Sequence, residues 1–222
     1  MALTKITGEG LGSLGTGNLT HGSDSGDTRF TLNSANQYTL VLKNAGNIAG
    51  QIGGSGSDVL RFSNAAGATI MEMNAGHVTM PYQPAFQARP SSTLTDIAIN
   101  TNVSLNFADE IFDRNADFNA GGSPSTFTAP VTGVYQLNLN TYILNLDTAS
   151  TYLQISIITS NRSYDLVIDP NFSSDLTFYH MTLSALADMD AGDTAYIQAY
   201  QSGGTAQTDI SAGATFSGYL VA

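Results

Sequence analysis

One stretch of the chain, residues 127–140, constrains the fold more than any other. It reads F-T-A-P-V-T-G-V-Y-Q-L-N-L-N, with Pro130 and Gly133 placed to form a short turn. After this turn, apolar side chains alternate with polar ones, which is the period of a β-strand with one face in a core. The apolar positions are Tyr135, Leu137, Leu139 and Ile143. The stretch therefore predicts a central strand of an antiparallel sandwich.

The same alternation recurs further along the chain and predicts additional strands. It is present in residues 152–157, 178–185, 195–200 and 215–221. Only 11% of the residues are charged, and Gly, Ser, Thr, Asn and Ala are abundant. Such a composition favours short strands and turns over helices. We therefore expect an all-β chain.

Four segments carry a resemblance to a known family. F-T-A-P-x-T-G-V-Y, at residues 127–135, resembles the signature of the complement globular-head domain, whose jelly-roll fold is shared with the tumour necrosis factor superfamily. Residues 84–88, 191–198 and 215–220 resemble further segments of that family, in the same order. The resemblance implies that residues 84–222 form an antiparallel jelly-roll head that associates as a homotrimer, with its closing strand near the threefold axis.

The second face of these strands gives an independent indication of self-association. It carries Tyr, Gln, Thr and Ser but no charge, whereas a monomeric surface normally mixes both charges. We therefore predict a trimer interface, with Tyr196, Tyr200, Tyr219 and His180 as candidate residues. For His180, one interpretation is a position where it meets its copies at the axis, and the other is an ordinary polar strand residue.

Residues 29–83 form a run of short predicted strands with a recurring Asn-Ala-(Ala)-Gly turn. The predicted strands are 29–32, 38–43, 48–52, 59–62, 69–73 and 77–80. Strands this short bury little apolar area in a single chain. We therefore expect three chains to wrap together and to complete one another's sheets, which gives an intertwined β shaft and neck.

Two shorter matches favour a viral source. Residues 76–86 resemble the shaft-to-head junction of bacteriophage fibre proteins, and the opening M-A-L-T-K-I-T-G-E-G-L-G-S-L resembles the N-terminus of fibre-like proteins from phages of marine bacteria. Residues 1–28 are rich in glycine and have little apolar periodicity. They fit either a disordered tail or a virion-attachment segment that becomes ordered only in an assembly. The prediction is thus an attachment segment at 1–28, a shaft and neck at 29–83, and a head at 84–222.

The charge of the chain excludes one class of partner. The net charge is −11, and residues 84–222 contain 13 acidic and 3 basic residues. Binding to nucleic acid needs clustered Lys and Arg, so no nucleic-acid partner is expected. No apolar run is long enough for membrane insertion, and the first residues lack the apolar core of a signal peptide. We expect assembly in the host cytoplasm and a final location on the virion surface.

One loop has the ligand spacing of a cation site. Its sequence, D-R-N-A-D-F-N, places oxygen ligands at Asp113, Asn115 and Asp117, as calcium loops do. The match to an EF-hand fails at its sixth position, Phe118, and at its twelfth, Pro124. A solvated acidic loop is therefore the favoured interpretation, and a weak site for a divalent cation such as calcium is the alternative. No other cofactor is expected.

Nothing in the sequence indicates catalysis. We find no nucleophile elbow, no phosphate loop and no His/Asp pair beside a marked Ser. The D-M-D-A-G-D segment at 188–193 is interpreted as a tight turn before a strand. Cysteine is absent, so disulfides and thiolate metal sites are excluded. The chain is therefore predicted not to be an enzyme.

These observations predict a structural fibre protein of a phage tail or capsid. Residues 1–28 would contact another virion protein, and the head would bind a host cell-surface glycan or protein through its loops. The candidate loops are 113–126, 144–151, 161–176 and 201–212. Three alternatives remain: a decoration or tail-assembly protein without a receptor, a soluble complement-type recognition protein, and a glycan-cleaving tip. The missing collagen-like repeat counts against the second of these.

Overall fold

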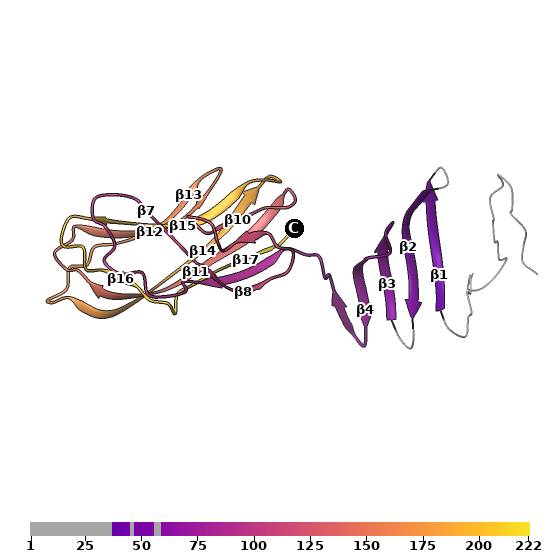
Figure 1. Cartoon of the computed structure of the whole chain (residues 1–222), viewed down its shortest axis with the longest axis horizontal. Helices are drawn as coiled ribbons and strands as arrows, with labels where there is room; N and C mark the ends of the chain where they lie inside the picture. The colour runs from indigo at the N-terminus through magenta and orange to yellow at the C-terminus, as the bar shows by residue number, and fades with distance from the viewer. Residues whose placement is uncertain (1–36, 45–46, 56–58) are drawn as a thin grey trace, which may run out of the picture.

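The structure is a computed structural model that describes residues 37–44, 47–55 and 59–222. Every regular element in these ranges is a β-strand, so the all-β prediction is confirmed (Figure 1). None of the described residues forms a helix of the length and apolar character needed to cross a membrane. The predicted attachment segment at 1–28 and the predicted strand at 29–32 lie outside the described residues.

The N-terminal part is a five-stranded antiparallel sheet, which we call the shaft sheet. Its strands follow one another in space as they do in sequence: β1 (Gln37–Asn44), β2 (Asn47–Ser55), β3 (Val59–Asn64), β4 (Thr69–Asn74) and β5 (His77–Thr79). Each strand pairs with the next strand of the same chain. Five of the six strands predicted for residues 29–83 lie in this sheet, and their ladders form between strands of the same chain.

The recurring Asn-Ala-Gly motif marks a tight hairpin turn. Between β4 and β5, Ala75 and Gly76 both have positive φ, at 45° and 83°. Two such residues in succession give the turn that matches the twist of an antiparallel hairpin. The related turn after β3 uses Asn64, whose Oδ1 accepts the N–H groups of Ala66 and Ala68 at 3.0 Å. The motif therefore sets where β3 and β4 end.

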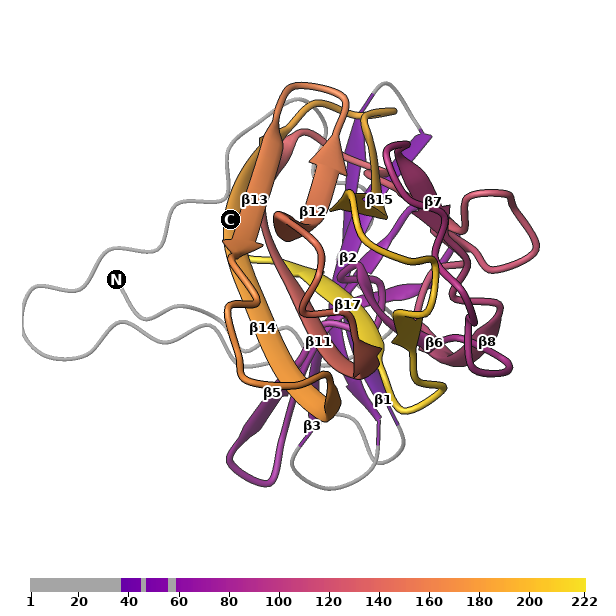
Figure 2. The same ribbon diagram turned by 90° about the vertical axis from the view of Figure 1, so that its left-hand side faces the viewer.

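The head is a sandwich of two sheets, each with six strands (Figures 1 and 2). The first, the β11 sheet, has the order β14-β11-β17-β6-β8, with β16 paired to β11. Its strands are β6 (Ala85–Arg89), β8 (Asp109–Asp113), β11 (Gly133–Leu146), β14 (Leu176–Met189), β16 (Asp209–Ile210) and β17 (Thr215–Leu220). Because β14 and β17 flank β11, the predicted central strand is confirmed.

The second sheet, the β15 sheet, has the order β13-β12-β15-β10-β9, with β7 paired to β15. Its strands are β7 (Val103–Leu105), β9 (Phe118–Asn119), β10 (Thr126–Thr128), β12 (Tyr152–Thr159), β13 (Ser163–Ile168) and β15 (Thr194–Ser202). In Figure 2, β14, β11 and β17 lie in one layer and β13, β12 and β15 in the other. The core lies between these layers.

Alternate residues of β11 enter the core, as the period of two predicts. Tyr135, Leu137 and Ile143 are fully buried. Thr141 interrupts this apolar series and is buried as well, but its Oγ1 donates a hydrogen bond to the carbonyl oxygen of Met181 at 3.0 Å. A buried hydroxyl with a partner carries little penalty, so the strand continues through this position.

A cluster of phenylalanines fills the end of the core near the neck. Phe86 stacks on Phe118 and on Phe127, each with ring centroids 4.8 Å apart, and meets Phe216 edge-on at 5.0 Å. These rings come from β6, β9, β10 and β17, so the cluster joins the two sheets. It fixes the opening and closing strands of the head beside each other.

Candidate functional site

Three loops gather at the end of the head farthest from the shaft sheet, and we call this end the tip. They are residues 147–151, 169–175 and 203–208, which connect β11 to β12, β13 to β14 and β15 to β16. β11 starts at Gly133, near the C-terminus and the neck, and runs to this far end (Figure 1).

One carboxylate joins all three loops. Oδ1 of Asp175 accepts hydrogen bonds from the N–H and the hydroxyl of Thr148, at 2.9 and 2.7 Å. Its Oδ2 accepts a hydrogen bond from Nε2 of Gln207 at 2.7 Å. Because these donors stabilise the ionised form, with the N–H of Thr148 as the largest contribution, the pKa of Asp175 lies below its usual value of 3.8. The ionised form of Asp175 thus organises the tip.

A second carboxylate holds the tip from inside. Asp147 is buried, and its side chain accepts hydrogen bonds from the N–H groups of Ala149, at 2.8 Å, and of Thr205. The backbone passes so close here that a Cβ on Gly204 would overlap Oδ2 of Asp147 and lie 2.9 Å from the backbone nitrogen of Ser150. Gly204 also has a φ of 75°, so this position requires glycine on both counts.

A cavity of about 290 Å³ opens beside these loops. Its lining residues are Asp96, Asn145, Asp175, Leu176, Thr177 and Gln207. The lining provides carboxylate acceptors, two amides and a hydroxyl, and it contains no basic side chain. These groups can exchange hydrogen bonds with hydroxyl groups, but they repel anions. The cavity therefore suits a neutral or cationic ligand that offers hydrogen-bonding groups such as hydroxyls.

The predicted binding loops do not all meet at the tip. The predicted loops 144–151, 161–176 and 201–212 contribute to it, whereas residues 113–126 begin at the opposite end of the head. There, Nδ2 of Asn115 donates a hydrogen bond to the carbonyl oxygen of Tyr82 in the neck, at 2.8 Å. Sequence alone could not show which loops share an end, because this depends on the order of the strands.

In the candidate cation loop, backbone N–H groups of the loop itself donate hydrogen bonds to the carboxylate of Asp113. The two carboxylate oxygens of Asp113 accept the N–H groups of Asn115 and Phe118, at 3.2 and 2.7 Å. One oxygen of Asp117 has no hydrogen-bond partner, and burial, with a smaller effect from the charge of Asp113, raises the pKa of Asp117. In the described part of the chain, no three or more His, Asp or Glu side chains are grouped to hold a metal. The geometry is that of a turn closed by Asp113.

The D-M-D-A-G-D segment also forms a turn, as predicted. Asp193 donates its N–H to the carbonyl oxygen of Asp190 at 2.9 Å, and its side chain accepts the N–H of Asp190 at 2.9 Å. Gly192 has a φ of 94° at the bend. These contacts lead the chain directly into β15.

The second candidate surface is the outward face of β11, β14 and β17, which we call the outer β11 face. Direct pairing across the strands places Leu186, Gln136 and Tyr219 in one row, and Ser184, Asn138 and Ser217 in the next. Between the row of Tyr219 and that of Phe178, these three strands carry no Asp, Glu, Lys or Arg on this face. Large apolar side chains are exposed here: Phe178 by 73%, Leu186 by 61%, Tyr219 by 49% and Tyr142 by 44%. Such a surface is typical of an interface.

The four predicted interface residues divide between two faces. Tyr219 and His180 lie on the outer β11 face, where the ring of His180 stacks on Tyr142 with centroids 4.5 Å apart. Tyr196 and Tyr200 lie on β15 and face outward from the other sheet. The core separates the two pairs, so one flat interface cannot contain all four residues. The alternation of apolar and polar residues shows that a side chain faces outward, but not which sheet carries it. It also did not identify Leu186 as a candidate interface residue.

One family model matches the head, and several solved structures are similar to it. The family model for the C1q domain matches residues 85–221. Among solved structures, the globular domain of zebrafish complement 1qA protein is 20% identical, covers 63% of this chain and 98% of its own, and has a TM-score of 0.45. A crystal structure of murine APRIL at pH 5.0 is 9% identical, covers 63% and 99% of the two chains, and has a TM-score of 0.42. A search of curated proteins finds no match.

Proposed function

The chain belongs to the C1q domain family, and from this premise we propose that it is a homotrimeric, non-catalytic fibre protein whose head binds a receptor. The trimer would form through the outer β11 face, and the tip would carry the binding site. The observation that carries this proposal is the uncharged outer β11 face with its exposed apolar side chains, which a soluble monomer would leave in water. A homotrimer buries it without introducing any charge into the interface.

The elongated shape of the chain supports the fibre. The shaft sheet and the head lie end to end along the longest axis, and the tip is remote from the shaft sheet (Figure 1). We propose that residues 1–28 attach the protein to another structural protein of a phage tail or capsid, which places the tip outward on the virion surface. The resemblance of residues 76–86 and of the first residues to phage fibre proteins supports this assignment.

The chemistry of the tip favours a neutral host glycan as the receptor, with a host protein as the alternative. The tip cavity offers Asp175, Gln207 and Asn145 for hydrogen bonds to sugar hydroxyls. One such site binds weakly, but three copies on one trimer gain avidity for a repeated cell-surface glycan. A second candidate function is a decoration or tail-assembly protein that has no receptor of its own.

The oligomeric state is the first test. Light scattering on the full chain should give three times the monomer mass of 23.3 kDa. The head alone, residues 84–222, should also be a trimer, because the outer β11 face lies wholly within it. A monomeric full chain would overturn the proposed function.

Attachment and binding need separate tests. A chain that lacks residues 1–28 should still form a trimer but should no longer be incorporated into virions; normal incorporation would refute the attachment role. On an array of neutral and anionic glycans, the head should bind neutral ones, and Asp175→Asn should weaken this binding. Asp165→Asn, on β13 and outside the tip, is the matched control. A head that binds no glycan and no host protein would favour the decoration protein.

A further inference from the structure

The shaft sheet has one face whose two central rows are entirely apolar. Residues that pair directly in an antiparallel sheet point to the same side. One such row crosses four strands through Leu40, Ile52, Phe62 and Met71. The neighbouring row crosses three strands through Leu60, Met73 and Val78, on the same side. We call this side the apolar shaft face.

The opposite side of the shaft sheet is mostly polar. It presents Gln51 and Ser63 in one row, and Arg61, Glu72 and Thr79 in another, together with a few valines. Nε of Arg61 and Oε2 of Glu72 form an ion pair across β3 and β4 at 2.6 Å. A sheet with one apolar and one polar face is built to pack on one side only.

No described part of the chain covers the apolar shaft face. The strands of the shaft sheet have extensive contacts only with their neighbours in that sheet, and none of their residues belongs to the buried core of the protein. Val78 is 58% exposed, Leu40 45% and Met73 42%. A single-layer sheet of this kind has no core of its own in one chain.

We propose that the apolar shaft face is covered by the same face of two further copies, so that three shaft sheets close into a triangular prism with the apolar faces inside. This rests on the trimer proposed above. Neighbouring strands of the sheet already pair with one another within one chain, so in this arrangement the copies contribute side-chain packing to the face. The two central rows carry no charge, and Lys43, which pairs with Ile48, lies at the margin of the face, so three identical faces meet without like charges being buried in its centre.

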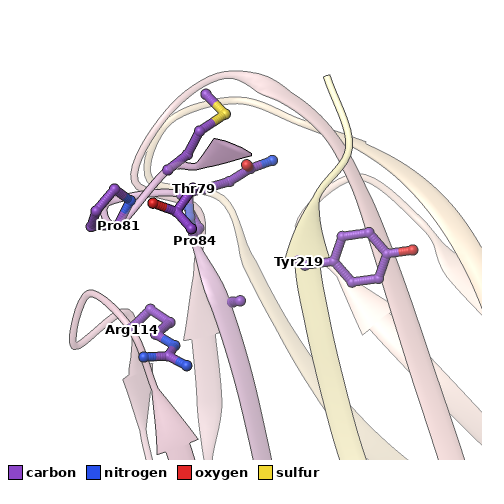
Figure 3. Close-up of a pocket in the computed structure, with 8 residues that line it drawn as sticks. Thr79, Pro81, Pro84, Arg114 and Tyr219 are labelled. Carbon is purple, nitrogen blue, oxygen red and sulfur yellow. The ribbon is translucent and has the colours of Figure 1, made fainter. Parts of the chain in front are cut away.

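The neck connects this face to the proposed trimer interface of the head. Met80 lies two residues after Val78, and it lines a cavity of about 590 Å³ together with Tyr219 of the outer β11 face. Figure 3 shows Pro81, Pro84 and Arg114 around this cavity, with Tyr219 across from them. The apolar shaft face and the outer β11 face therefore lie close to each other at the neck, as they would if a single set of copies covered both.

Single cysteines in the full chain test the prism directly, because the natural sequence contains none. Val78→Cys and Thr79→Cys change adjacent exposed residues on opposite sides of β5. At the other end of the sheet, Leu42→Cys lies on the apolar shaft face and Val41→Cys on the opposite side. Both natural side chains are apolar and exposed, Val41 by 39% and Leu42 by 47%. Each variant is treated with a maleimide, to measure accessibility, and with bis-maleimides of increasing span, to cross-link chains.

The prism predicts that Val78→Cys and Leu42→Cys react at least about tenfold more slowly with the maleimide than Thr79→Cys and Val41→Cys. In the Val78→Cys and Leu42→Cys variants, the shortest bis-maleimides should cross-link one chain to another. In the Thr79→Cys and Val41→Cys variants, they should not. Because each chain has one cysteine, every cross-link joins two chains.

Three results would overturn the prism, and they differ in what else they affect. The first is that the cysteines at 78 and 79 react equally fast, and likewise those at 41 and 42, in a protein that light scattering shows to be a trimer. This result would refute the prism and leave the trimeric head intact. Slow reaction without cross-linking at any span would mean that another part of the same chain covers the face. A monomeric full chain would refute the prism and the proposed function together.

Discussion

At the scale of single residues, Gly218 shows how tightly the closing strand is fitted. A Cβ at this position would lie 2.7 Å from Cδ2 of Leu137 and 2.8 Å from Cε1 of Phe86. Both neighbours are fully buried in the core, so neither has room to move away. The glycine in T-F-S-G-Y-L is therefore required by packing between the opening strand, the central strand and the closing strand.

Gly218→Ala should destabilise the head by about 1–3 kcal/mol, because it overpacks the core. Urea unfolding, followed by circular dichroism, measures the change. Gly121→Ala is the matched control, since its Cβ would meet no atom closer than 3.8 Å. The control should stay within about 0.5 kcal/mol of the natural chain. Equal stability of the two variants would contradict this account of the closing strand.

Asp175 gives the tip a defined response to pH. The pKa of Asp175 in the folded protein is lowered from 3.8, so the stabilisation by its hydrogen bonds is complete above that value. It is lost as the pH falls through the lowered folded pKa. The amide resonance of Thr148, which donates to Asp175, should therefore titrate on acidification with a midpoint below 3.8. Asp175→Asn should abolish this titration, and a midpoint at or above 3.8 would contradict the prediction.

At the scale of strands, alternation in the sequence predicts the head well. It located β11, β12, β14, β15 and β17, and the side of each that enters the core. Two features lay beyond it. The alternation of apolar and polar residues does not show that Tyr200 and Tyr219 belong to different sheets. It also does not predict that Thr148 lies beside Asp175, 27 residues away in sequence. Both depend on strand order, which is set by long-range pairing rather than by local pattern.

The outer β11 face can be tested with one charge. Leu186→Asp should convert the trimer of the isolated head into folded monomers, because it would bury three carboxylates in the interface. Light scattering reports the mass, and circular dichroism reports the fold. Val167→Asp is the control: Val167 is 51% exposed, but it lies on β13 of the other sheet. A trimer that tolerates Leu186→Asp and dissociates with Val167→Asp would place the interface on the other sheet.

At the scale of the whole molecule, the head and the shaft sheet differ in the source of their stability. Among the described residues, the buried core lies entirely in the head, and the shaft sheet contributes nothing to it. If other copies supply a core for this sheet, the stability of the shaft sheet depends on protein concentration through mass action.

Hydrogen exchange on a dilution series measures this difference. Amide protons of β2–β4 should lose protection as the protein is diluted, while those of β11 and β12 keep most of theirs. The five short strands and the long head strands are thus compared within one sample. Protection of β2–β4 that is independent of concentration would show that the shaft sheet is stable in a single chain.

The direction of the shaft strands has a mechanical consequence. They run across the long axis of the molecule, so the hydrogen bonds between them run along it (Figure 1). A pulling force along this axis would separate the shaft strands one pair at a time, which is the peeling geometry. In the head, the same force would load all the hydrogen bonds between β11 and β14 together, in shear. Under tension we expect the shaft to lengthen before the head yields, each released strand adding roughly 20 Å of chain. A fibre built this way would be an extensible tether.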